Sequence, residues 1–148
     1  MQKSSRSFLF PDVNVWIALT YDQHVHHSSA ARWFAQLSDD AGICFCRITQ
    51  LSLLRLLTTK AVMSTDVLNR AEAWQVYDRW LEDSRVVFLD EPVGFEQAFR
   101  SQSRQAGPAP KEWADSYLVA FASLCGLQIV TFDRALRGRN GGALLLTT

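Results

Sequence analysis

The sequence predicts an α/β domain built around a mostly parallel β-sheet with helices on both faces. Short apolar and β-branched runs alternate along the chain with longer stretches of helical spacing, which is the pattern of β-α-β units. Apolar residues make up 48% of the chain, a proportion typical of a folded globule. The length of 148 residues favours one domain, spanning residues 1–148.

Five short apolar segments are the expected strands. They are bounded by turn-forming or polar residues and are too short to be helices. A parallel sheet places the carboxyl ends of its strands along one edge, where ligands of such folds bind. Polar residues directly after a strand are therefore the first candidates for a site. The expected strands are Phe8–Phe10, Ile43–Cys46, Val86–Leu89, Gln128–Phe132 and Ala143–Leu146.

The segments between these strands carry helix signals. Thr49 can cap a helix that runs to about Thr58, and Thr65 or Asp66 can cap one that reaches about Glu82. Gly126 is the expected stop of the helix before the fourth strand. The remaining expected helices are Val13–Tyr21, His24–Leu37, Phe95–Gln102 and Glu112–Leu124.

Composition excludes several classes of protein. The formal net charge is zero, so no global basic character indicates a nucleic-acid binder. Three cysteines, an odd number, argue against a secreted disulfide framework. Cys44 and Cys46 lie two residues apart in an apolar run, where we expect reduced core residues rather than zinc ligands.

Membrane insertion and secretion are not expected. No apolar run approaches the 18 residues or more that a membrane-spanning helix needs. The segment Met1–Ser7 is short and polar and does not have the features of a signal peptide. The expected location is the cytoplasm.

Three carboxylates stand where the predicted fold would place a site. Asp12 follows the first strand and Asp133 follows the fourth, although each could also cap the next helix. Asp115 lies in the first turn of the helix before the fourth strand, where it could instead complement the helix dipole. Three converging carboxylates repel one another unless a cation neutralises them. Their hard oxygen ligands predict a Mg²⁺ or Mn²⁺ site.

Four short motifs make the chain resemble the PIN domain family, specifically the VapC-type toxins of bacterial toxin–antitoxin pairs. They are an Asp-x-Asn after the first strand, a Thr and an Arg after the second, Trp-x-Asp-x-Tyr, and Thr-Phe-Asp-Arg. Their order and spacing are more specific than any one motif alone. The matching stretches are Asp12–Leu19, Thr49–Leu57, Trp113–Ala122 and Ile129–Leu136.

The resemblance implies a fold, an activity and partners. The fold would be a three-layer PIN-like domain with a five-stranded parallel sheet in the order 3-2-1-4-5. The activity would be Mg²⁺- or Mn²⁺-dependent cleavage of single-stranded regions of RNA, with Asp12, Asp115 and Asp133 as catalytic metal ligands. Asn14 and Thr131 would be polar groups that support them. The partners would be an RNA substrate, a cognate VapB-like antitoxin and a second copy of the chain in a homodimer.

One position departs from the family pattern. The family usually has a Glu after the second strand, and this chain has Gln50. An amide can offer a carbonyl oxygen to a cation but no charge. We therefore expect Gln50 to face the acidic site, and Gln50→Glu to tighten the binding of the metal.

Two arginines are candidate phosphate contacts, each with a plainer alternative. Arg55 lies in the apolar run Leu53–Leu57, where it could be a solvent-exposed residue at the helix edge or a clamp on phosphate. Arg134 opens a basic segment with Arg137 and Arg139, which could bind RNA or could simply be exposed.

Two other functions fit parts of the pattern. Haloacid-dehalogenase-type phosphatases also begin with an Asp at the end of a strand, normally followed two residues later by a second Asp. Here that second position is Asn14, which lacks the acid–base proton. The other alternative is a catalytically weakened PIN fold that binds RNA or protein, an interpretation that Gln50 keeps open.

Overall fold

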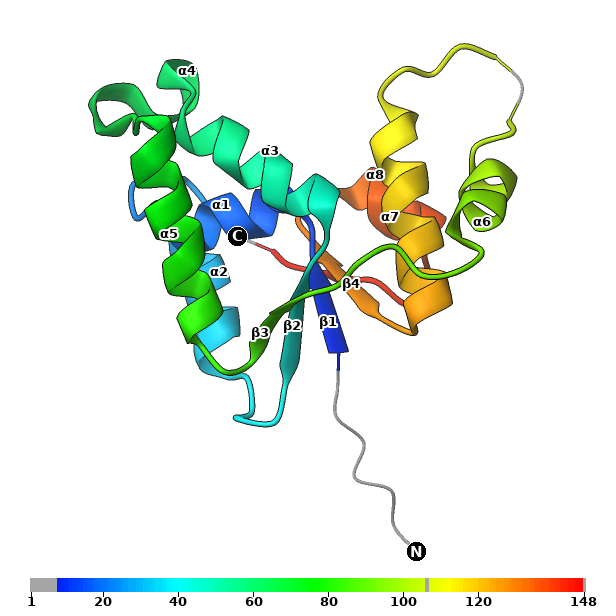
Figure 1. The fold of residues 1–148 in the computed structure, drawn as a ribbon, viewed down its shortest axis with the longest axis horizontal. Helices are drawn as coiled ribbons and strands as arrows, with labels where there is room; N and C mark the ends of the chain where they lie inside the picture. Colours follow the sequence, from blue (N-terminus) through cyan, green and yellow to red (C-terminus); the bar gives the residue numbers. More distant parts are fainter. Residues whose placement is uncertain (1–7, 106, 148) are drawn as a thin grey trace, which may run out of the picture.

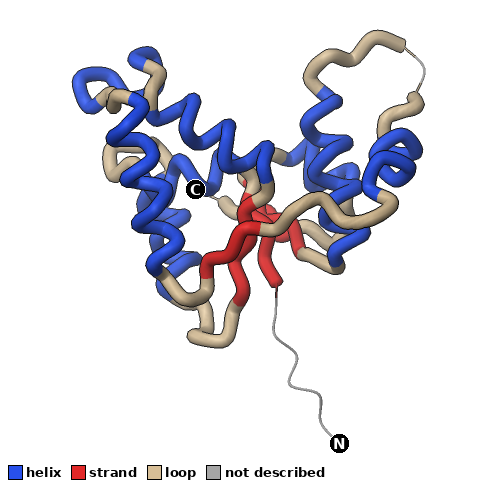
Figure 2. The backbone as a smooth tube through the Cα atoms, viewed as in Figure 1, coloured by secondary structure: helices blue, strands red, loops and turns tan. Residues whose placement is uncertain are grey.

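The computed structural model describes residues 8–105 and 107–147. The segment Met1–Ser7, examined above for a signal peptide, lies outside the described residues. Five parallel strands form one sheet in the order β3-β2-β1-β4-β5, as predicted. Figure 2 shows the strands gathered at the centre of the domain. They are β1 (Phe8–Pro11), β2 (Gly42–Phe45), β3 (Val86–Phe88), β4 (Gln128–Thr131) and β5 (Leu144–Leu145).

Helices cover both faces of this sheet, which confirms the three-layer prediction (Figure 1). One group of helices carries the core residues of one face, and a second group carries those of the other. The α-helices of the first group are α1 (Val13–Thr20), α2 (His27–Ala35), α3 (Arg47–Leu57), α4 (Lys60–Met63) and α5 (Arg70–Glu82). The second group contains α6 (Phe95–Gln102), α7 (Glu112–Cys125) and α8 (Arg134–Arg139). A 3₁₀ turn, η1 (Ser64–Asp66), follows α4.

The strands divide their side chains between two cores, because successive residues of a strand point to opposite faces. Phe10 and Cys44 pack with the residues of α7, and Phe10 stacks on Phe121 at 5.2 Å between ring centroids. On the other face, Phe45 stacks on Trp16 of α1 at 3.8 Å. Cys44 and Cys46 are fully buried in the core, as expected.

Several expected helix boundaries were wrong. Helix α3 begins at Arg47 rather than after Thr49, with Cys46 in the N-cap position. Thr49 instead occupies the third helical position, where its hydroxyl accepts the backbone N–H of Cys46 at 3.0 Å. Helix α5 is capped by Asn69, whose side chain accepts the N–H of Glu72. The elements α4, η1 and α8 were not predicted, and α2 is shorter than the segment His24–Leu37.

The strand order singles out the carboxyl end of β1 at the edge of the sheet. Strand β1 lies at the centre; the chain runs outward from it through β2 and β3 on one side, then crosses over to form β4 and β5 on the other. The strand order therefore reverses at β1, which is where open α/β sheets bind ligands beyond their carboxyl ends. Within the described residues, no helix is long and apolar enough to cross a membrane.

Candidate functional site

Asp12 lies directly beyond β1, at the reversal of strand order. Its backbone N–H donates to the carbonyl oxygen of Val130 at 2.8 Å, which extends the pairing of β1 with β4. Its carboxylate accepts the backbone N–H of Val13 at 2.7 Å through Oδ1 and the hydroxyl of Thr131 at 3.1 Å through Oδ2. Asp12 therefore caps α1, as the simpler interpretation proposed, and is also tied to the neighbouring strand.

Thr131 connects the groups around Asp12. The side chain is fully buried, and its hydroxyl, having donated to Asp12, accepts the amide of Asn14 at 3.4 Å and the backbone N–H of Asp133 at 3.0 Å. The side-chain oxygen of Asn14 accepts the N–H of Phe132 at 3.3 Å. Asn14 and Thr131 thus hold the loop after β4 against the start of α1, and their role as supporting groups of a metal site stays a prediction.

Asp133 and Asp115 approach this network from two other elements. Asp133 caps α8 by accepting the N–H of Ala135 at 2.8 Å through Oδ1, while its Oδ2 has no hydrogen bond within the described residues. Asp115 lies half-buried in the first turn of α7. The long loop before α7 brings this helix to the carboxyl edge of the sheet (Figure 1).

The three carboxylates act on one another electrostatically. Burial raises the pKa of Asp12 to about 6, hydrogen bonds from Val13 and Thr131 oppose this, and the charges of Asp115 and Asp133 add to it. The pKa of Asp115 is also raised, by burial and then by the charge of Asp133, while Arg139 lowers it. Asp115 and Asp133 are thus close enough to Asp12, and Asp133 to Asp115, to destabilise the ionised form of that neighbour.

The chemistry of this donor set fits a hard divalent cation. A cation would relieve the repulsion among these carboxylates and favour the ionised forms of Asp12 and Asp115, and carboxylate oxygens are the ligands that Mg²⁺ and Mn²⁺ prefer. As the side chains lie, no three Asp, Glu, His or Cys groups in residues 8–105 and 107–147 are gathered closely enough to hold an ion. The assignment of Asp12, Asp115 and Asp133 as metal ligands therefore stays a prediction.

Gln50 lies in the first half of α3 and is buried. Its side-chain oxygen accepts a hydrogen bond from the guanidinium of Arg47 at 2.6 Å. Burial raises the pKa of Tyr77, and a hydrogen bond with Gln50 opposes that shift. The contacts of Gln50 in the described part of the chain thus lie with Arg47 and Tyr77. The expectation that it faces the carboxylates remains a prediction.

The arginines considered above differ in their surroundings: two are exposed, and Arg139 is hydrogen-bonded to another helix. Arg55 is exposed and lines a groove between α3 and α5 with Leu51 and Trp74, which agrees with the helix-edge alternative. Arg134 is exposed beside Asp133. Arg139 instead donates to the carbonyl oxygen of Gln102 at 2.9 Å, which joins α8 to the end of α6.

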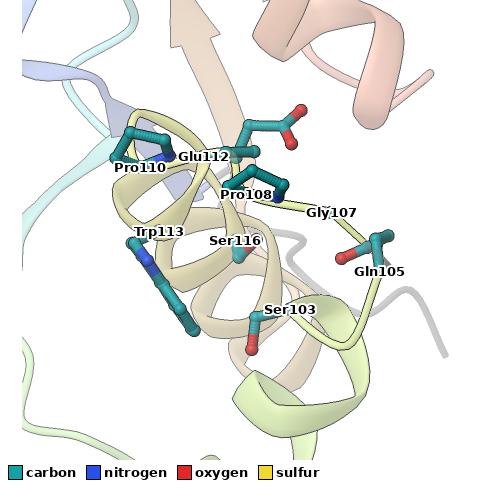
Figure 3. A pocket seen from close by; sticks show the side chains of 9 residues that line it. Ser103, Gln105, Gly107, Pro108, Pro110, Glu112, Trp113 and Ser116 are labelled. Carbon is teal, nitrogen blue, oxygen red and sulfur yellow. The ribbon is translucent and has the colours of Figure 1, made fainter.

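A pocket of about 400 Å³ opens at the start of α7 (Figure 3). Ser103 and Ser116 lie within it, and Glu112 and Trp113 point in different directions at its rim. Trp113 is 58% exposed although it is a large apolar residue. The two prolines of the preceding loop, Pro108 and Pro110, form the outer wall.

The fold and the carboxylates define an α/β domain with an acidic site at the reversal point of a parallel sheet. The sequence profile of the family described as PIN domain matches residues 9–140. Ribonuclease VapC41 of Mycobacterium tuberculosis is 41% identical over an alignment of 142 positions, and the match covers 93% of this chain and 97% of that protein. The chain therefore belongs to the PIN domain family and, within it, to the VapC group.

Solved structures share the fold at low sequence identity. The crystal structure of Mycobacterium tuberculosis VapC20, described as a Sarcin-Ricin loop cleaving toxin, covers 95% of this chain and 100% of its own, with a TM-score of 0.66 and 16% identity. The DNA-bound VapBC complex from Salmonella typhimurium covers 95% and 97%, with a TM-score of 0.62 and 18% identity. These neighbours confirm the fold predicted from the resemblance.

Proposed function

We propose that this protein is a Mg²⁺- or Mn²⁺-dependent endoribonuclease that acts as the toxin of a toxin–antitoxin pair. The observation that carries the proposal is the network of Asp12, Thr131, Asn14 and Asp133 at the reversal point of the sheet. The names of its relatives supply the reaction class, since VapC41 is a ribonuclease. The carboxylates supply a donor set that fits a metal-dependent hydrolase.

The residues of the site divide into ligands and supports. Asp12, Asp115 and Asp133 would hold the metal, which when bound polarises the phosphodiester and activates water for attack. Thr131 fixes Oδ2 of Asp12 by donating its hydroxyl, and the backbone of Val13 fixes Oδ1. A carboxylate held at both oxygens keeps its orientation while RNA binds, and preorganisation of this kind lowers the reaction barrier.

The phosphatase alternative is disfavoured by Asn14. Its amide nitrogen donates to Thr131 and its oxygen accepts from Phe132, so both ends of the side chain are used in holding the loops together. An amide in that position cannot transfer the proton that the second carboxylate of a haloacid-dehalogenase-type enzyme supplies. Asn14 is a supporting group in the proposed ribonuclease.

A cleavage assay tests the proposal. The purified protein is incubated with structured RNAs in EDTA, in Mg²⁺ and in Mn²⁺, and new ends are mapped by sequencing. We expect cuts at defined single-stranded positions, only with metal, and none with Asp133→Asn. A folded wild-type protein that binds the RNAs but leaves them intact with either metal would favour the binding-module alternative. Release of phosphate from small esters would favour a phosphatase.

A cognate VapB-like antitoxin is the proposed partner, and the apolar groove between α3 and α5 is the proposed contact. Leu51 and Trp74 are 53% and 47% exposed there, beside Leu54. Exposed aromatic and aliphatic groups of this kind are typical anchors of protein interfaces. We expect the antitoxin to cover this groove and to place a basic side chain among the carboxylates, where a guanidinium could replace the charge of the cation.

Binding measurements test this partner assignment. The antitoxin would be the product of a short reading frame next to this gene, and its affinity is measured by calorimetry. We expect Trp74→Ala to weaken binding by about 30-fold, the order of an interface anchor, without changing RNA cleavage by the free toxin. Unchanged affinity would move the interface elsewhere. The mass of the antitoxin-free protein in solution tests the expected homodimer.

A further inference from the structure

Arg47 is the first residue of α3. It directly follows Cys46, which comes after β2 and occupies the N-cap position of the helix. Its guanidinium carbon lies 4.6 Å from the centroid of the Phe88 ring, so the planar group rests on an aromatic face. Its Nη1 donates to the side-chain oxygen of Gln50 at 2.6 Å. Two neutral groups from different elements therefore fix the guanidinium.

The charge of Arg47 is not neutralised within the described part of the chain. No carboxylate there lies within ion-pair distance of it, and the residue is exposed. A guanidinium has five N–H donors, of which the contact with Gln50 uses one. A guanidinium that is held in place, is charged and has unused N–H donors matches the geometry of a phosphate group.

Arg85, which directly precedes β3, provides an internal comparison. Its guanidinium carbon lies 4.7 Å from the centroid of Phe34, and the group forms an ion pair with Asp83 at 2.8 Å. It also donates through Nε to the other oxygen of that carboxylate. Arg85 is thus stacked in the same way as Arg47, but its partner carries the opposite charge. Of these two stacked arginines, Arg47 is the one whose charge remains for an external anion.

Arg47 also lies at the same edge of the sheet as the acidic site. All neighbouring strands are parallel, so the ends of β1, β2 and β3 point the same way. Adjacent strands are about 4.8 Å apart, which puts the end of β3 roughly 10 Å from the end of β1. Phe88 ends β3 and Asp12 follows β1. A single nucleic-acid strand lying across this edge would meet both groups.

We propose that Arg47 binds a backbone phosphate of the RNA strand beside the scissile one, and that Gln50 holds Arg47 without neutralising it. This rests on the proposed ribonuclease function, which it extends to the position of the substrate. A Glu at position 50 would form an ion pair with Arg47 and reduce its attraction for phosphate. The departure of Gln50 from the family pattern is then part of the RNA-binding surface.

Binding of a labelled single-stranded RNA in EDTA, over a series of salt concentrations, tests this role without cleavage. We expect Arg47→Met to raise the Kd about tenfold, the loss of one charged hydrogen-bonding group. The slope of log Kd against log salt should fall by about 0.7, which is the value for one phosphate contact on a single strand. Gln50→Glu should change the Kd and the slope in the same direction although Arg47 remains.

Matched variants separate this effect from a loss of folding. Gln50→Met removes the hydrogen bond but adds no charge, so it should reduce the affinity less than Gln50→Glu does. Arg85→Met removes the stacked arginine at the other end of β3 and should leave the salt slope unchanged. Thermal unfolding of every variant confirms that the binding data come from folded protein.

The outcomes distinguish this inference from the proposed function. If the wild-type protein cleaves RNA but Arg47→Met keeps its Kd and salt slope, the role of Arg47 is refuted and the ribonuclease stands. If the wild-type protein binds RNA with the expected slopes but never cleaves it, phosphate binding by Arg47 stands, while the ribonuclease and the position of Arg47 beside a scissile phosphate are refuted. Absence of any RNA binding by the wild-type protein refutes both.

Discussion

The two edges of the sheet hold their charges in different ways. At the amino end of β3, Arg85 is paired with Asp83, and the charges cancel locally. At the carboxyl edge, Asp12 is held by the hydroxyl of Thr131 and Arg47 by the amide of Gln50, both neutral. Charges held by neutral partners remain available to a ligand. The ion pair at the amino end of β3 therefore serves the structure, and the carboxyl edge is the one that we propose for binding.

The largest expected effect comes from removing a charge at the carboxyl edge. Asp12→Asn keeps the shape of the side chain but removes one of the proposed metal ligands. We expect RNA cleavage to fall on the order of 1000-fold, since metal-based stabilisation of charge is worth several kcal/mol. Expression of the wild-type protein alone should arrest growth, and the variant should relieve the arrest. A folded Asp12→Asn variant that stays toxic would argue against metal catalysis.

Removing the neutral partner should have a smaller effect. Thr131→Val keeps the volume of this buried residue but deletes the hydroxyl that orients Asp12 and accepts from Asn14. We expect metal affinity or cleavage to fall by about 10- to 100-fold, the usual range for groups that orient metal ligands. Thr58→Val is the matched control, because its hydroxyl contacts only the carbonyl oxygens of Leu54 and Arg55. Equal losses in the two variants would count against a specific role for Thr131.

In metal-free buffer, the contributions of Asp12 and Asp83 to the stability of the fold should change in opposite directions with pH. The folded pKa of Asp12 is raised from 3.8 to about 6, so the native state holds this proton more tightly than the unfolded state does. Stability from this group is therefore greatest below pH 3.8 and falls as pH rises to about 6, by roughly 1–3 kcal/mol. Hydrogen bonding to Arg85 lowers the pKa of Asp83, so its contribution is lost as pH falls.

Urea unfolding at several pH values measures both contributions. In EDTA, Asp12→Asn should remove the decline in stability between about pH 4 and 6. Asp83→Asn should leave that decline in place and lower the stability only slightly above pH 4, because the ion pair is partly exposed. A wild-type protein whose stability rises steadily through this range would show that Asp12 is not desolvated as the structure indicates.

The smallest expected effect is that of Gln50→Glu on the metal. A new carboxylate at this position would contact Arg47, which would offset most of its attraction for a cation. We expect Mn²⁺ affinity to change by less than about threefold, an energy below 1 kcal/mol. A gain of tenfold or more in calorimetry would instead support the expectation from the sequence alone, that position 50 faces the three carboxylates.

The sequence predicted best what depends on local pattern and known motifs. Strand order and layers followed from the resemblance and were confirmed, and the strand-end positions of Asp12 and Asp133 followed from apolar runs. Thr49 was predicted at the N-cap of its helix but lies at the third helical position. A threonine there can also hydrogen-bond the backbone of the first turn, so the sequence signal is the same for both positions. The cap of α5 had a readable signal in Asn69 followed by Glu72, three residues later.

The role of Arg47 could not be read from the sequence. The guanidinium of Arg47 contacts the ring of Phe88, which lies on β3 and comes close to Arg47 only in the folded sheet. The same holds for Arg139, whose contact with Gln102 joins α8 to α6 across a long stretch of chain. Helix α8 itself is short and contains Gly138, so propensity alone gives no reason to expect it.

The bond between Thr131 and Asp12 spans 119 positions of the chain, which links the site to the order of protein synthesis. The chain is made from its amino end, so Asp12 emerges well before its partners on β4 and α8. An interrupted nascent chain that stops before β4 contains Asp12 but lacks Thr131 and Asp133. Such a fragment cannot assemble the carboxylate network, and the proposed nuclease therefore completes its site only after β4 and the start of α8 have been synthesised.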